Sequence, residues 1–145
     1  MVTNALQPTI TEWQMMREQA SILVKTGFLP RSIDTPEKAV AIMLKGREMG
    51  IPPMQAFSQI HVIAGKPTLS PELMLGLIFK QCPGTKVVYK QNDDLGCIIR
   101  VTRPGHPGQD FSFSMADAKR ANLTGKDTWK TYPRAMLRSR CIAEM

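Results

Sequence analysis

No stretch of this 145-residue sequence stays apolar over the roughly 18 residues that a membrane-spanning helix requires, and neither end carries a basic amphipathic anchor. Residues 1–11 also lack the charged and apolar regions of a secretory signal peptide. The sequence therefore predicts a cytoplasmic protein with no membrane partner.

Cysteine and histidine are scarce. The three cysteines, Cys82, Cys97 and Cys141, are odd in number and far apart, which favours buried reduced thiols over a disulfide framework. The two histidines, His61 and His106, form no ligand spacing with the cysteines, so we expect no zinc site.

Catalytic motifs are missing as well. The segment 65–68, Gly-Lys-Pro-Thr, lacks the glycine spacing of a phosphate-binding P-loop, and a hairpin tip that presents one cation explains it better. Asp93, Asp94 and Asp110 suggest a two-metal nuclease centre, but the first two are adjacent in an apparent turn, where turn chemistry explains them better. We expect no catalytic residue, no metal and no cofactor.

Basic residues, in contrast, are in excess. Nineteen Lys and Arg face twelve Asp and Glu, which leaves a formal net charge of +7 at pH 7. A positive field of this size attracts polyanions, and nucleic acid is the first partner to consider.

Capping residues and apolar spacing predict most of the helices. Thr35-Pro36-Glu37 and Ser70-Pro71-Glu72 both place a hydroxyl, a proline and an acid where a helix begins. Thr11 is expected to cap the first helix and Gly27 to end it. The predicted helices cover residues 11–25, 36–49, 53–57, 71–82, 115–121 and 133–145.

Two segments have the alternation of β-strands. Residues 60–64 and 68–69 predict a hairpin with Gly65 as the first central residue of its turn, while residues 86–90, 97–101 and 111–113 predict a three-stranded meander. On the meander, Lys86, Lys90 and Arg100 alternate with the apolar residues, so we expect an open basic face. The expected buried face consists of Val87, Tyr89, Cys97, Ile99, Val101, Phe111 and Phe113. We predict the α+β class: a three-stranded antiparallel β-meander and a β-hairpin packed with helices.

The densest cationic region runs from residue 119 to residue 140, with seven basic residues and one acid, Asp127. Arg134 and Arg138 are four residues apart, so both project from one side of a helix and are placed to bind phosphate; a solvated helix face is the alternative. Trp129 and Tyr132 lie among these cations, where stacking on bases and packing in the core are both open. The residues that we predict to contact DNA are Lys66, Lys86, Lys90, Arg100, Lys126, Trp129, Lys130, Arg134, Arg138 and Arg140.

Two sequence blocks resemble a known family. The first, within residues 39–75, contains GREMGIPPMQA at 46–56, IHVI at 60–63, GKPTLS at 65–70 and ELM at 72–74. The second contains Trp129, Tyr132-Pro133, Met136-Leu137 and residues 138–143. Together they span most of the chain and resemble the RecT family of phage single-strand annealing recombinases.

The resemblance implies a β-β-β-α core shared with Red beta, and ATP-independent pairing of complementary single strands through an annealed duplex intermediate. It also implies rings or helical filaments of identical subunits, with a phage exonuclease or a host single-strand binding protein as partner. We expect one annealing domain over 1–145 that is truncated at its C-terminal helix, because that helix reaches Met145 without a stop signal. The alternatives are a protein-interaction module without DNA affinity and, less favoured, a metal-dependent nuclease.

Overall fold

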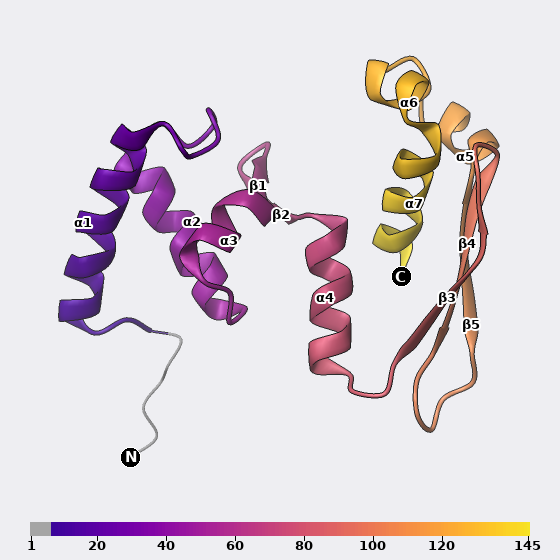
Figure 1. The fold of residues 1–145 in the computed structure, drawn as a ribbon, viewed down its shortest axis with the longest axis horizontal. Helices are drawn as coiled ribbons and strands as arrows, with labels where there is room; N and C mark the ends of the chain where they lie inside the picture. Colours follow the sequence, from indigo (N-terminus) through magenta and orange to yellow (C-terminus); the bar gives the residue numbers. More distant parts are fainter. Residues whose placement is uncertain (1–6) are drawn as a thin grey trace. The chain divides into compact units, whose positions relative to one another are not determined.

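The computed structural model describes residues 7–145 and shows an α+β protein (Figure 1). Residues 1–6, which form part of the segment used in the signal-peptide prediction, lie outside the described residues. The chain divides into two compact units at Ser70/Pro71, which we call the N-terminal unit and the C-terminal unit. The single annealing domain over 1–145 stays a prediction, because compactness alone does not decide whether the two units act as one domain.

The N-terminal unit contains α1 (Ile10–Thr26), α2 (Pro36–Glu48), α3 (Pro53–Gln59), β1 (Ile60–Ile63) and β2 (Lys66–Leu69). Its caps explain where the first two helices begin. Thr9, not Thr11 as predicted, accepts a hydrogen bond from the Glu12 amide at 3.1 Å, and Thr35 accepts one from the Lys38 amide at 3.3 Å, as predicted. The buried apolar residues of this unit include Met16, Ala20, Ala39, Val40, Ile42, Met43, Ala56, Phe57 and Ile60.

The hairpin β1–β2 is antiparallel, with Ile60 opposite Leu69 and Ile63 opposite Lys66. Its two turn residues are Ala64 and Gly65, at φ 52° and 77°. The prediction that Gly65 comes first in the turn was therefore wrong by one residue, since Ala64 also adopts a positive φ. Two positive φ values in sequence are typical of the turn that matches the twist of a hairpin.

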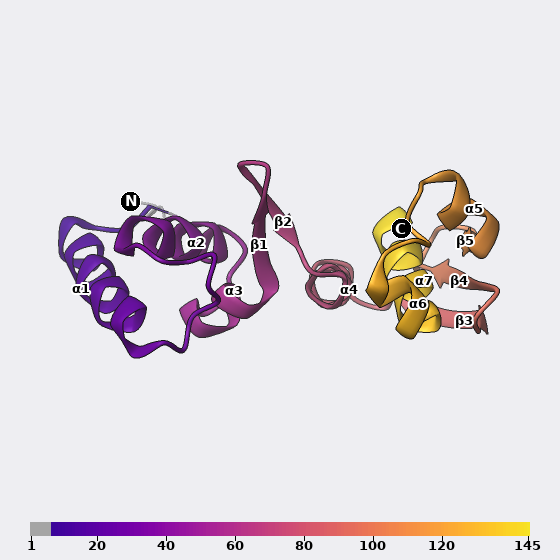
Figure 2. The same cartoon turned by 90° about the horizontal axis from the view of Figure 1, so that it is seen from above.

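The C-terminal unit contains α4 (Pro71–Gln81), β3 (Lys86–Asn92), β4 (Gly96–Thr102), β5 (Gln109–Ser114), α5 (Met115–Arg120), α6 (Asp127–Thr131) and α7 (Pro133–Glu144). The strands form the predicted antiparallel meander in the order β3-β4-β5. Helix α7 lies along β4 and β5, and α4 packs beside α7 (Figure 2). In both views, no described helix of this unit covers the other face of the sheet.

The core of the C-terminal unit lies between the sheet and α7. Cys97, Ile99, Leu137 and Cys141 are fully buried there, and the partly buried Val87, Val101, Phe111 and Phe113 pack against them. The predicted inner face is thus confirmed except at Tyr89, which lies opposite Ile99 but remains 42% exposed. Helix α6, five residues long, lies between the predicted helices 115–121 and 133–145, where no helix was predicted.

No helix among residues 7–145 combines the length and the apolar character needed to cross a lipid bilayer.

Candidate nucleic-acid interface

The net positive charge is concentrated in the C-terminal unit. This unit has twelve Lys and Arg against seven Asp and Glu, whereas the N-terminal unit has seven against five. Most of the excess that attracts a polyanion is thus contributed by the unit that contains the sheet and α7.

Helix α7 carries two exposed arginines close to its packing side, since Arg134 lies only about 20° around the helix axis from the buried Cys141. Proline at its first position suits a helix start, and Leu137 and Cys141 are buried against the sheet. At about 100° per residue, Arg134 and Arg138 lie about 40° apart around the helix axis, and both are exposed. Neither makes an ion pair with any residue of the described chain. Two exposed guanidinium groups therefore lie close together on α7, and neither forms an ion pair within the described residues.

The other cations of this cluster do not all join that pair. Arg140 follows Arg138 by two residues, so it projects from a side of α7 about 160° away from it. Lys126 immediately precedes α6 and Lys130 lies within it; both are exposed and have no ion-pair partner among residues 7–145. The predicted single cluster is thus a pair on α7, an isolated Arg140, and two lysines at α6.

The open face of the sheet is less basic than predicted, because an acid on the edge strand β5 pairs with two of its cations. Asp110 on β5 lies opposite Arg100 on β4 and accepts a hydrogen bond from its Nη1 at 2.9 Å. The other Asp110 oxygen accepts from Lys90 Nζ at 3.0 Å, and Lys90 lies at the bulge where the β3–β4 register shifts. Of the three predicted cations on this face, only Lys86 lacks an ion pair within the described residues.

The same contacts change the titration of Asp110. The hydrogen bond from Lys90, together with the charges of Lys90 and Arg100, holds the pKa of the Asp110 carboxyl below its ordinary value. The carboxylate therefore remains ionised and retains both cations over the neutral pH range. For this reason we rank Lys90 and Arg100 below the α7 arginines as phosphate ligands.

Trp129 does not have the predicted stacking role. Only 4% of it is exposed, and its ring centroid lies 6.4 Å from that of Phe113 in the core. A buried indole cannot stack on a base, so the alternative of core packing is correct for this residue. The neighbouring aromatic residue, Tyr132, is 64% exposed, and the sequence did not separate the two roles.

Lys66 is the one predicted DNA contact in the N-terminal unit. It begins β2 directly after the hairpin turn and is exposed. The segment from Gly65 to Thr68 is part of the hairpin, not a loop that leads into a helix, as expected from its lack of P-loop spacing.

The cysteines are free, and two of them are buried between the sheet and α7. Burial raises the pKa of Cys141 to about 12 and also raises that of Cys97. The Cys141 thiol donates weakly to the carbonyl oxygens of Phe111 at 3.3 Å and Cys97 at 3.5 Å. Thiols held in the neutral form are poor nucleophiles, and both of these cysteines are packed in the core of the C-terminal unit. No group of three or more metal-ligating side chains is found within residues 7–145.

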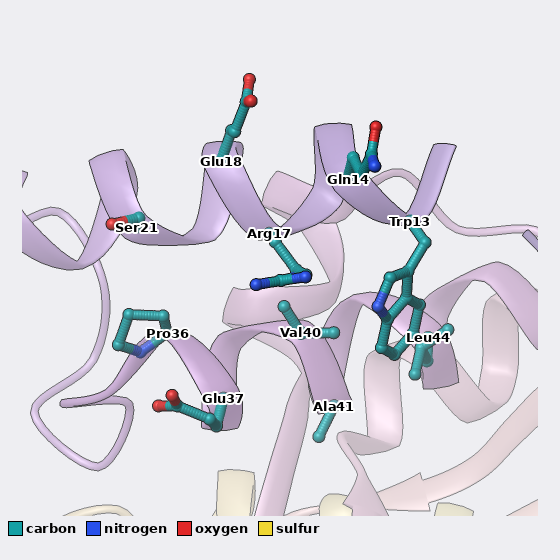
Figure 3. A pocket seen from close by; sticks show the side chains of 10 residues that line it. All are labelled: Trp13, Gln14, Arg17, Glu18, Ser21, Pro36, Glu37, Val40, Ala41 and Leu44. Atoms are coloured by element: carbon teal, nitrogen blue, oxygen red, sulfur yellow. The ribbon is translucent and has the colours of Figure 1, made fainter. Parts of the chain in front are cut away.

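A groove of about 990 Å³ lies between α1 and α2 in the N-terminal unit (Figure 3). Figure 3 shows Trp13 pointing toward Leu44, and Arg17 directed toward Val40. Arg17 is the only cation among the lining residues, which also include two glutamates. The groove is thus an apolar surface without excess positive charge, and it is not a candidate phosphate site.

Comparison of the chain with protein-family models, with curated proteins and with solved structures gave no match. The resemblance to RecT recombinases therefore remains an interpretation of the residues quoted above.

Proposed function

We propose that this chain binds single-stranded DNA through the C-terminal unit and anneals complementary strands without ATP, as a RecT-like recombination protein. The observation that carries the proposal is the pair Arg134 and Arg138, exposed on one side of α7 and without an ion-pair partner among the described residues. Like charges held this close repel each other, and a bound phosphate relieves that repulsion.

The mechanism requires no hydrolysis. Cations along the protein neutralise the phosphates of one strand, which lowers the repulsion that a second strand meets on approach. Base pairing then supplies the free energy of annealing, and contacts to phosphates do not depend on sequence. Besides the α7 pair, the proposal includes Lys126, Lys130 and Arg140 as contacts to the same strand or its duplex product.

The arrangement of elements supports a RecT-like interpretation. A three-stranded antiparallel meander followed by helices has the element types of the β-β-β-α core that the sequence resemblance implies. With that resemblance, the proposal extends to a homo-oligomeric ring or filament in a bacterial cytoplasm, and to a phage exonuclease or a host single-strand binding protein as partner.

The test measures binding and annealing separately. Fluorescence anisotropy of a labelled mixed-sequence 30-nucleotide strand measures affinity at low salt, and quenching between two labelled complementary strands measures annealing in chelator without ATP. We expect saturable binding and an annealing rate above that of free DNA. A protein that leaves the labelled strand unbound even in dilute buffer would overturn the proposal.

The groove between α1 and α2 favours a second candidate function, that of a protein-interaction module. Its exposed indole and aliphatic side chains form a concave apolar surface of the type that receives a partner side chain (Figure 3). This candidate predicts that the protein ignores oligonucleotides at moderate salt, which the same anisotropy measurement decides.

A further inference from the structure

A small open pocket of about 400 Å³ lies in the C-terminal unit, where the turn between β3 and β4 meets the junction of α6 and α7. Asp94 lines it from the turn, and Tyr132, Pro133 and Arg134 line it from the junction. It thus brings together an exposed aromatic ring, a cation and a carboxylate.

The backbone that presents Tyr132 is held on both sides. Its amide donates to the Thr128 carbonyl oxygen at 2.8 Å, which closes α6, and its carbonyl oxygen accepts from the Met136 amide at 3.1 Å, which opens α7. The next residue is Pro133, whose ring fixes its own φ. Trp129, buried one helical turn earlier, anchors α6 to the core. The phenol ring is therefore displayed from a rigid junction, which reduces the entropy lost when a ligand stacks on it.

The turn across the pocket is held by a different aspartate. Asp93 Oδ1 accepts hydrogen bonds from the backbone amides of Leu95 at 2.9 Å and of Gly96 at 3.0 Å. These bonds lower the pKa of the Asp93 carboxyl, and the bond from Leu95 has the larger effect. Asp94 has no part in that network. Within residues 7–145 its carboxylate makes no hydrogen bond or ion pair, and neither does the guanidinium of Arg134.

We propose that this pocket is a subsite for one nucleotide of a bound single strand. The base stacks on Tyr132, its phosphate binds Arg134, and Asp94 accepts a hydrogen bond from an amino group of the base. This inference rests on the proposed single-strand binding and specifies how one nucleotide is held.

The chemistry of the pocket discriminates among bases. Cytosine, adenine and guanine carry an exocyclic amino group that donates to a carboxylate, whereas the one donor of thymine, its N3–H, lies between two carbonyl oxygens that a carboxylate repels. Stacking on a ring tolerates every base, because each has a flat π-face. The strand is therefore held at most positions without sequence preference, while this subsite disfavours thymine.

Affinities of oligo(dC) and oligo(dT) for the full chain and its variants provide the test. Because one base–aromatic stack is lost, Tyr132→Leu should weaken oligo(dC) binding about tenfold, whereas Tyr132→Phe should stay within about twofold of the wild type. Tyr89→Leu is the matched control, since Tyr89 is also exposed but does not line the pocket. Asp94→Asn should abolish the preference for oligo(dC) over oligo(dT), because its amide both donates and accepts.

A crosslink locates the base directly. Irradiation of the wild type on an oligonucleotide that contains 5-iododeoxycytidine should yield an adduct on Tyr132, identified by mass spectrometry of the digested protein. If the wild type binds no oligonucleotide, the proposed function fails and the subsite with it. If it binds and anneals, but Tyr132→Leu binds equally well and the adduct lies elsewhere, only the subsite is refuted. Thermal unfolding of each variant confirms that its fold is intact.

Discussion

Replacing both α7 arginines by alanine should change how DNA binding responds to salt. Each single-strand phosphate neutralised by a cation contributes about 0.7 to the magnitude of the slope of log affinity against log salt concentration. Arg134 and Arg138 are exposed, share one side of α7 and lack ion-pair partners among the described residues, so each is free to neutralise one phosphate. The Arg134→Ala/Arg138→Ala variant should therefore have a slope smaller in magnitude by about 1.4.

That slope difference is large enough to measure by anisotropy. As the NaCl concentration rises from about 50 mM to about 200 mM, the affinity of the wild type should fall about sevenfold more than that of the variant. The folded state should persist, because substitutions at exposed positions usually change the free energy of unfolding by less than about 0.5 kcal/mol.

A matched control separates local contacts from net charge. Lys25→Ala/Arg31→Ala removes the same two charges from exposed positions of the N-terminal unit. Its slope should stay close to that of the wild type. Equal slopes for the wild type and the α7 variant would refute the phosphate assignment, and equal losses in both double variants would show that only net charge matters.

Three further substitutions and one chemical modification test the fold, the core and the sheet face. Gly76→Ala should stabilise α4 by up to about 1 kcal/mol, since a Cβ there meets open space. Gly46→Ala should destabilise the protein, since its Cβ would lie 2.7 Å from that of Ala56. Chemical denaturation measures the free energy of unfolding of both variants. At pH 8, iodoacetamide should modify the partly exposed Cys82 and spare Cys141 until the protein unfolds, because the raised pKa of Cys141 leaves almost no thiolate; mass spectrometry of the timed reaction decides. Asp110→Asn should tighten oligonucleotide binding and steepen its salt dependence, because two cations on the sheet are released; an unchanged anisotropy curve would exclude that face from binding.

The secondary structure was largely predictable, because its signals are local. Alternation of apolar residues predicted the meander, and the capping residue Thr35 predicted the start of α2. The helix predicted over 115–121 is α5. Helix α6 was missed because five residues are too few to show a helical period. The hairpin turn was misplaced because Ala64 takes a positive φ that residues other than glycine adopt rarely.

The candidate site was less predictable, since it depends on contacts between distant residues. Asp110 lies 20 residues from Lys90, and only the strand register shows that the acid reaches that cation. Burial separates Trp129 from Tyr132, two aromatic residues only three positions apart with similar neighbours in the sequence. Nothing in the local composition marks the division at Ser70/Pro71 either.

Whether a basic residue already has an ion-pair partner ranks the candidate DNA contacts better than the number of basic residues does. On the sheet, the Asp110 carboxylate already pairs with Lys90 and Arg100, so a phosphate must compete with it for both cations. On α7, Arg134 and Arg138 make no ion pair within the described residues, and Leu137 and Cys141 fix the same helix in the core. A rigid support with unpaired guanidinium groups loses little entropy on binding and gives up no existing contact. A polyanion that reaches the C-terminal unit should therefore bind at α7 first, and engage the sheet only where its charge is high enough to displace Asp110.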